Sequence, residues 1–256
     1  MQNTNHIQSI QVPNFLSSEN GNLNWQTNAD VNILAGPNGL GKTTLLKALF
    51  EKNKSSKKID YLNLQEMPAL DKVELDYSKN FLKLQNTLDF HLRLVQEKYY
   101  QYVKIINEQK RLLQCSEMSD VDKTYWEQTL TRSQGICFDI LDELFITKKI
   151  DRDNHNCICF VENLDFYKGC NTLSAGQKSI LIILLTVLIQ DNQPYTLIID
   201  NPEANLHCDW QANLIDYIRK INKNCQIIMA THAPSIIING WRDKVFEITD
   251  LYTKHN

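Results

Sequence analysis

The sequence of 256 residues is poor in glycine and proline, with eight Gly and six Pro. Average usage would give roughly 18 Gly in a chain of this length. The shortage excludes collagen-like chains and disordered chains that are rich in Gly or Pro. Four of the eight glycines lie in two short motifs, Gly36, Gly39 and Gly41 in one and Gly176 in the other. Because glycine is favoured where backbone approaches a ligand closely, both motifs are candidate binding sites.

The sequence also lacks a secretory signal, a long apolar run and an excess of positive charge. The N-terminus is polar, and the longest apolar run, residues 180–189, is too short to span a bilayer. We interpret this run as a buried helix and expect a cytoplasmic protein without membrane insertion. The seven cysteines are odd in number and scattered, which is typical of reduced thiols. The net charge of −3 leaves no global basic field, so any DNA contact must be a local patch.

Strand-like runs alternate with turns and helices in the first and last thirds of the chain. Early strands are expected at 7–12, 23–25, 31–35 and 59–64, with a helix at 43–50. Late strands are expected at 157–161, 195–199, 225–230 and 245–248, with helices at 178–189 and 210–221. This alternation predicts an α/β fold with a mainly parallel core sheet and an N-terminal antiparallel β region. The basic segment 52–58 is interpreted as a solvated loop, with a nucleic-acid contact as the alternative.

The middle of the chain follows a helical period instead. Apolar side chains are spaced by four and three residues, at Leu88, Leu92, Val95, Tyr99, Tyr102 and Ile106. A helix over 78–114 would be roughly 55 Å long, and Ser119 followed by Asp122 predicts the start of a second helix. We interpret residues 77–150 as a helical insertion between two parts of the core, 1–76 and 151–256. The stripe indicates ordinary packing, with a partner-binding surface as the alternative.

Residues 36–43 fit the phosphate-binding pattern G-x-x-x-x-G-K-[ST] without a mismatch. Backbone N–H groups in such a loop converge on phosphate oxygens. Lys42 would reach the β- and γ-phosphates, the Thr43 hydroxyl would bind Mg²⁺, and the following helix would add its positive end. The sequence therefore predicts a site for ATP and Mg²⁺, formed by Gly36, Pro37, Asn38, Gly39, Leu40, Gly41, Lys42, Thr43 and Thr44.

A second strand ends in a carboxylate. The apolar run that begins at Tyr195 stops at Asp200. Ligands of open α/β sheets bind at the carboxyl ends of the strands, so we expect Asp200 to lie beside the phosphate-binding loop. A carboxylate in that place can hold Mg²⁺ directly or through water.

The motif Leu173-Ser174-Ala175-Gly176-Gln177 precedes this strand. Together with the loop, Asp200 and the pair Thr231-His232, it resembles the signature of ATP-binding cassette (ABC) ATPases, L-S-G-G-Q or L-S-x-G-[QE]. The resemblance covers most of the chain outside the insertion and implies a head-to-tail dimer around ATP. It implies that Ser174, Gly176 and Gln177 contact the γ-phosphate held by the other copy. It further implies that Gln65 senses Mg²⁺ and the attacking water, and that His232 contacts the γ-phosphate.

The segment 201–207, Asn-Pro-Glu-Ala-Asn-Leu-His, with Trp210-Gln211, resembles the D-E-P-E-x-x-L-H…WQ pattern of the OLD/RecF/SMC-like branch of ABC-type ATPases. Ala230-Thr231-His232-Ala233-Pro234 is similar to the A-T-H-S-P motif of this branch. Relatives of this build in bacteria accompany a separately encoded nuclease in phage-defence systems such as Septu, so the resemblance implies such a partner. A DNA repair or chromosome ATPase that binds DNA directly, and the cytosolic subunit of a membrane transporter, remain alternatives.

One position departs from the family pattern. The catalytic glutamate of the family immediately follows the strand aspartate, where this chain has Asn201. An asparagine side chain can orient a water but cannot accept its proton. Three interpretations follow: slow hydrolysis with ATP acting mainly as a dimer clamp, a base supplied by Glu203 or by a partner, or a residue changed on purpose to trap the ATP state.

Overall fold

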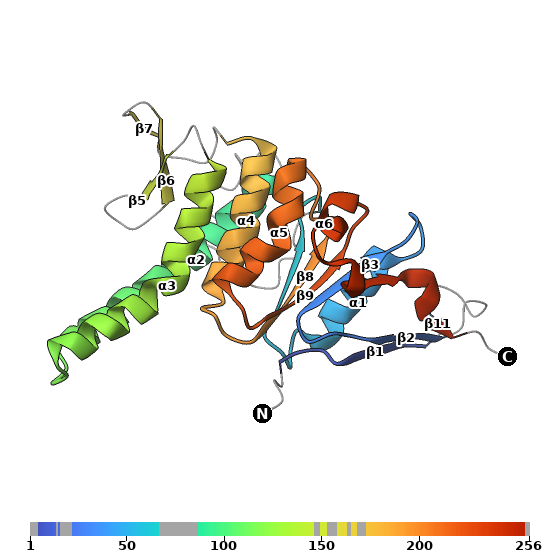
Figure 1. Cartoon of the computed structure of the whole chain (residues 1–256), viewed down its shortest axis with the longest axis horizontal. Coiled ribbons are helices and arrows are strands. Elements are labelled where there is room, and N and C mark those ends of the chain that lie inside the picture. Colours follow the sequence, from blue (N-terminus) through green and yellow to red (C-terminus); the bar gives the residue numbers. More distant parts are fainter. Residues whose placement is uncertain are drawn as a thin grey trace, which may run out of the picture. The chain divides into compact units, whose positions relative to one another are not determined.

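The computed structural model describes residues 5–13, 15, 22–66, 87–145, 149–152, 158–162, 165–167 and 173–253 (Figure 1). The chain divides into two compact units. The first comprises Met1–Pro68, Gln193–Arg219 and Lys223–Asn256, and the second comprises Ala69–Asn192 and Lys220–Asn222. The predicted division of the chain at residues 76 and 150 stays a prediction.

A five-stranded sheet forms the centre of the first unit. Its strand order is β10-β3-β9-β8-β4, and every neighbouring pair is parallel. The strands are β3 (Val31–Ala35), β4 (Ile59–Asn63), β8 (Tyr195–Asp200), β9 (Cys225–Ala230) and β10 (Val245–Glu247). Strands β3 and β9 are buried throughout, as expected for continuous apolar runs in a parallel sheet. Because all five strands run the same way, their carboxyl ends share one edge.

A small antiparallel sheet and helix α1 (Lys42–Asn53) build the rest of this core. The small sheet has the order β1-β2-β11, from Ser9–Val12, Asn22–Gln26 and Tyr252–Thr253. Its central strand alternates strictly, so Leu23 and Trp25 are fully buried. They share one apolar cluster with Leu45 and Leu46 of α1. This packing fixes the start of α1, and hence the loop before it, on the sheet.

Shorter elements complete the first unit after β8. Helix α5 (Cys208–Ile221) buries Leu214, Ile215 and Ile218, a helical spacing that gives it one apolar face. Helix α6 (Pro234–Ile238) follows β9, and two short 3₁₀ turns, Arg242–Lys244 and Ile248–Leu251, flank β10.

The second unit is mostly helical. Helices α2 (Thr87–Gln114) and α3 (Asp120–Leu144) each pack against the other and against α4 (Ala175–Ile189), and a small antiparallel sheet has the order β5-β6-β7. The sheet strands are Lys149–Arg152, Ile158–Glu162 and Asp165–Tyr167. In the first turn of α4, the Lys178 ammonium lies 2.6 Å from the Asp89 carboxylate of α2, and both side chains are largely buried.

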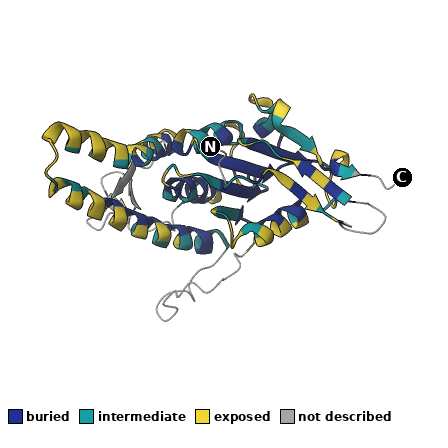
Figure 2. Ribbon diagram, turned by 90° about the horizontal axis from the view of Figure 1, so that it is seen from below, coloured by how far each residue is buried: buried dark blue, intermediate teal, exposed yellow. Residues whose placement is uncertain are grey.

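The far part of the α2–α3 hairpin has little core of its own. No described residue between 107 and 133 is buried, and the ribbon of both helices is coloured mostly as exposed there in Figure 2. Apolar side chains are among them, such as Leu112 at 59%, Val121 at 79% and Tyr125 at 62% exposure. The folding energy of the hairpin therefore comes from its near part, where α2 and α3 contact α4.

Several sequence predictions are confirmed by these elements. Ser119 caps α3 by accepting a hydrogen bond from the Asp122 amide, and the predicted stripe of α2 is packed inside, apart from the half-buried Leu88. The stripe is thus ordinary packing. Residues 78–86, included in the expected first helix, lie outside the described residues. Among the described helices, none is both long and apolar enough to cross a membrane.

Candidate nucleotide-binding site

The glycine-rich loop connects β3 to α1 at the carboxyl edge of the five-stranded sheet. Gly36 has a φ of 135°, and a Cβ atom at this position would lie 2.8 Å from Cγ2 of Ile248. Gly41 has a left-handed φ of 82° and precedes the first turn of α1. Both conformations disfavour a side chain. The loop therefore brings bare backbone to the helix N-terminus, a suitable arrangement for a phosphate.

Lys42 folds back over this loop. Its Nζ donates to the carbonyl oxygens of Gly36 at 2.8 Å and Pro37 at 2.9 Å. Two of the three donors of the ammonium group are thus directed to the loop, and the third can be given to a phosphate oxygen. Burial lowers the pKa of Lys42 below its ordinary value, while the charges of Asp200, Glu203 and Glu247 oppose this effect.

Asp200 ends β8 at the same edge of the sheet. Its Oδ2 accepts a hydrogen bond of 3.1 Å from the Asn63 amide, whereas Oδ1 is buried with no hydrogen-bond partner among the described residues. Burial raises the pKa of this carboxyl above its ordinary value, and the Thr43 hydroxyl opposes the rise. A buried carboxylate oxygen without a partner, next to a threonine hydroxyl, is a donor set that fits Mg²⁺. If Mg²⁺ binds in this place, Asp200 and Thr43 would hold it.

Gln65 follows β4 at this edge, and its side chain is exposed. Its backbone amide donates to Oδ1 of Asn63 at 3.1 Å. Asn63 thus contacts both Asp200 and the segment that carries Gln65. Sequence reasoning missed Asn63, although its place near the end of an expected strand, two residues before Gln65, was a usable signal.

Glu203 lies in the turn after β8 and holds the segment after β9. Its two carboxylate oxygens accept from the Thr231 hydroxyl at 2.7 Å and from the His232 backbone amide at 2.8 Å. The Thr231 hydroxyl also accepts from the Ala233 amide at 3.0 Å. Because both oxygens of Glu203 are occupied in this way, the carboxylate positions His232, whose side chain is exposed. This geometry does not favour Glu203 as a base.

Asn201 has a left-handed backbone conformation, with a φ of 51°. Asparagine tolerates this region better than most residues with a side chain. Its backbone amide donates a hydrogen bond of 2.9 Å to the Ala230 carbonyl oxygen, which connects the turn to the end of β9. Asparagine, which stands here in the position of the family's glutamate, therefore suits the left-handed backbone conformation.

The signature residues belong to the second unit. Ser174 is the N-cap of α4 and accepts from the Gln177 amide at 3.2 Å, while the Gln177 side chain accepts from the Ser174 amide at 3.0 Å. This capping box satisfies two donors at the N-terminus of a 15-residue helix. Ser174 is exposed and Gly176 half-buried, so this helix end can meet an anion from outside.

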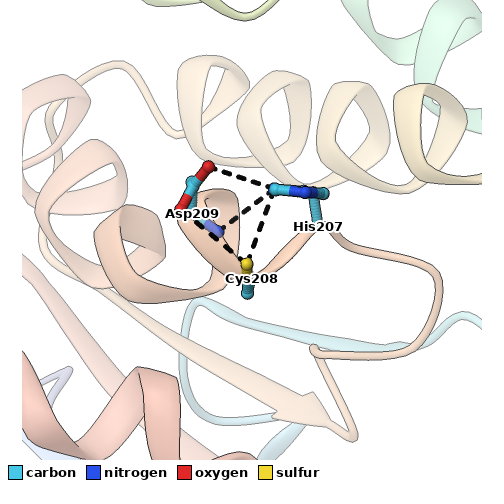
Figure 3. Close-up of side chains that lie close together, drawn as sticks. All are labelled: His207, Cys208 and Asp209. Carbon is cyan, nitrogen blue, oxygen red and sulfur yellow. Dashed lines mark hydrogen bonds and ion pairs between the residues drawn. The ribbon is translucent and has the colours of Figure 1, made fainter.

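His207, Cys208 and Asp209 form an exposed cluster at the start of α5 (Figure 3). The His207 Nδ1 lies 3.2 Å from an Asp209 carboxylate oxygen and 3.7 Å from the Cys208 sulfur. The Cys208 thiol also contacts Asp209 at 3.7 Å. Exposed contacts of this kind contribute little to stability.

Comparisons with known proteins agree with this site and fold. The profile of the RecF/RecN/SMC N terminal domain family matches residues 6–255. Over 115 residues, or 40% of this chain, the sequence is 30% identical to the Septu protein PtuA of Bacillus thuringiensis. Over 75 residues, or 25% of this chain, it is 33% identical to the Retron Ec83 probable ATPase of Escherichia coli.

These matches cover 28% of the Septu protein and 14% of the retron ATPase, so the chain spans under a third of either relative. Among solved structures, the SmcHead bound to the C-winged helix domain of ScpA is similar in fold. Its TM-score is 0.53 at 13% identity, over 91% of both chains. The chain therefore belongs to the RecF/RecN/SMC N-terminal domain family, and parts of it are similar in sequence to a Septu protein and to a probable ATPase of a retron.

Proposed function

We propose that this chain is an ATPase that binds ATP with Mg²⁺ at the loop of residues 36–44, hydrolyses it slowly, and uses it mainly to clamp two copies together. The observation that best supports this proposal is the carboxyl edge of the five-stranded sheet. The loop, Asp200 and the segment with Gln65 all follow strands that end at this edge. In this proposal Lys42 contacts the β- and γ-phosphates, and Thr43 and Asp200 hold Mg²⁺. Gln65 and His232 face the γ-phosphate, where a water attacks.

Slow turnover follows from the residues next to Asp200. Asn201 has no group that can accept a proton from the attacking water. Glu203 is engaged by Thr231 and His232 through both oxygens. Asn201 thus offers no proton acceptor, and the hydrogen bonds of Glu203 hold its carboxylate in a structural role, so we retain slow hydrolysis as the preferred interpretation of Asn201.

The clamp uses two surfaces of the chain. The signature residues Ser174, Gly176 and Gln177 would contact the γ-phosphate held by a second copy, in a head-to-tail homodimer. The capped and exposed N-terminus of α4 supports this, because its first turn is already fixed before an anion arrives. Two bound nucleotides would then stabilise the dimer by mass action.

The names of the curated relatives support a place in anti-phage defence. One is a Septu protein and the other is a probable ATPase of a retron. We propose that the ATP-clamped form controls a separately encoded effector, a nuclease. Direct DNA binding is less supported, because three of the four lysines at 52–58 have partners within the chain. Lys54 pairs with Glu51, Lys57 donates to the His6 carbonyl, and Lys58 lies over the Tyr195 ring.

Sedimentation velocity tests the clamp directly. The chain is compared without nucleotide, with Mg²⁺-ATP, and as Lys42→Ala with Mg²⁺-ATP. We expect a dimer only for the unaltered chain with Mg²⁺-ATP, and turnover well below the range of roughly 1 per second and above that is typical of enzymes. A dimer that is equally populated without nucleotide, or fast turnover, contradicts the clamp.

Phage challenge tests the biological role. The gene is expressed in bacteria together with its flanking genes, and plating of a phage panel is compared with that on cells carrying Lys42→Ala. Protection that requires both Lys42 and one flanking gene supports control of an effector. Protection that is unchanged by Lys42→Ala, or absent against every phage, contradicts it.

A further inference from the structure

Asn63 occupies a position in the sheet that connects two parts of the site. It is the last residue of β4 and is paired in register with Asp200, the last residue of β8. Asn63 is only 5% exposed. The residues that precede the two strand ends, Leu62 and Ile199, are apolar and also buried. Burying an amide without compensating hydrogen bonds is unfavourable, so a buried asparagine here needs specific partners.

Both ends of the Asn63 amide have such partners. Its NH₂ group donates to Oδ2 of Asp200 and its carbonyl oxygen accepts from the Gln65 backbone amide, each at 3.1 Å. The two bonds are made by the two ends of one planar group. A shift of the loop at Gln65 therefore turns the amide plane and with it the donor that faces Asp200.

We propose that Asn63 is a positioning residue that orients the Asp200 carboxylate for Mg²⁺ and couples it to the segment carrying Gln65. This inference rests on the proposed binding of Mg²⁺-ATP. The bond to Oδ2 fixes the carboxylate so that Oδ1, which has no partner among the described residues, is the oxygen left for the metal. Groups that orient a ligand in this way typically change metal affinity 10–100-fold when removed.

The coupling acts in both directions between the metal site and the backbone at Gln65. With Mg²⁺ held at Oδ1, the Asp200 carboxylate would be fixed, and Asn63 would in turn fix the backbone at Gln65. Conversely, displacement of this backbone loosens the orientation of Asp200. By linkage the two effects have the same magnitude. Asn63 thus connects metal binding to the segment from which the chain continues into the helical insertion.

The test compares Asn63→Leu with the unaltered chain. Leucine has nearly the same size and removes both hydrogen bonds. The dissociation constant of a fluorescent ATP analogue is measured with Mg²⁺ and with EDTA, and Mn²⁺ affinity of the ATP complex is measured by electron paramagnetic resonance. We expect the gain in ATP affinity from Mg²⁺ to fall by about tenfold, with a similar loss in Mn²⁺ affinity, while affinity in EDTA is unchanged.

Asn222→Leu is the matched control. Asn222 is also fully buried and donates to the Gln190 side chain at 3.0 Å, but it belongs to the second unit. This variant should lose stability without changing the Mg²⁺ effect. If Asn63→Leu fails to fold, Asn63→Ser replaces it, since a smaller polar side chain leaves room for water and should lose part of the Mg²⁺ effect.

The outcomes separate the inference from the proposed function. If the unaltered chain binds no ATP, or binds it equally with Mg²⁺ and EDTA, the proposed site is wrong. If Mg²⁺ strengthens binding equally in the unaltered chain and in Asn63→Leu, only the positioning role is overturned. A parallel loss of affinity with Mg²⁺ and with EDTA, or an equal loss of the Mg²⁺ effect in Asn222→Leu, also overturns it.

Discussion

The hydrogen bonds of Glu203 allow a decision between a structural and a catalytic carboxylate. Glu203→Gln keeps the size and one acceptor oxygen, which can still bind the His232 amide, and its NH₂ group can donate to the Thr231 hydroxyl. Glu203→Ala removes both bonds. If the residue positions the segment after β9, Gln should preserve most ATP turnover and Ala should reduce turnover and stability together.

The magnitude follows from the two contacts of 2.7 and 2.8 Å. A hydrogen bond to a charged group contributes about 1.5–3 kcal/mol. Because Glu203 is half-buried, we use the lower end and expect a loss of about 3 kcal/mol for Ala and about 1 kcal/mol for Gln. For a chain of this size that corresponds to roughly 6–12 °C and 2–4 °C in the melting temperature of the first unit.

The assay combines scanning calorimetry with steady-state ATP turnover and ATP binding. Turnover of Glu203→Gln should stay within about threefold of the unaltered chain, a change in barrier below about 1 kcal/mol. A general base contributes 10²–10⁴-fold. If Glu203→Gln therefore loses turnover a hundredfold while its melting temperature and ATP affinity are kept, Glu203 is the base and the structural reasoning is refuted.

Three further predictions concern single positions. Asn201→Glu should raise turnover at least tenfold in a phosphate-release assay, because it supplies a proton acceptor. The same change should lower stability by about 1 kcal/mol, because the φ at this position is left-handed. Unchanged turnover would contradict a missing base at this position. Gly36→Ala should abolish ATP binding in a titration, since the new Cβ meets Ile248, whereas Gly135→Ala in α3 meets nothing within 4 Å and should stabilise by about 0.5–1 kcal/mol; ATP binding by Gly36→Ala would show that the loop tolerates a side chain. Ser174→Ala should cost the second unit about 1 kcal/mol in thermal unfolding and weaken the ATP-dependent dimer, and an unchanged dimer would argue against a signature contact.

The sequence predicted the parts of the site that depend on local chemistry. A glycine-rich loop between a strand and a helix, and an acid at the end of a buried strand, need no long-range information. Their meeting at one edge follows from parallel strand direction alone. Asp200 and Lys42 are therefore predictable as neighbours from the sequence, and the cap at Ser119 is predictable from the Asp three residues later.

Other features depended on register and side-chain direction, which the sequence pattern does not contain. Asn63 faces Asp200 only because β4 pairs with β8 without an offset. Glu203 follows Asn201 by two residues in the sequence, whereas the groups that it contacts, on Thr231 and His232, come from a different strand end. Short strands such as Tyr252–Thr253, which pairs with Asn22 and Leu23, have too few residues for a period to be recognised.

The exposed part of the α2–α3 hairpin gives the chain a freedom that its sheet does not have. Since no described residue from 107 to 133 is buried, turns can be added to or removed from both helices together without opening a cavity in the core. Each paired addition of seven residues would extend the hairpin by about 10 Å and keep the same faces in contact. The length of the hairpin is thus separable from the phosphate-binding loop and its sheet, so arm length can vary over evolution while the candidate site stays unaltered.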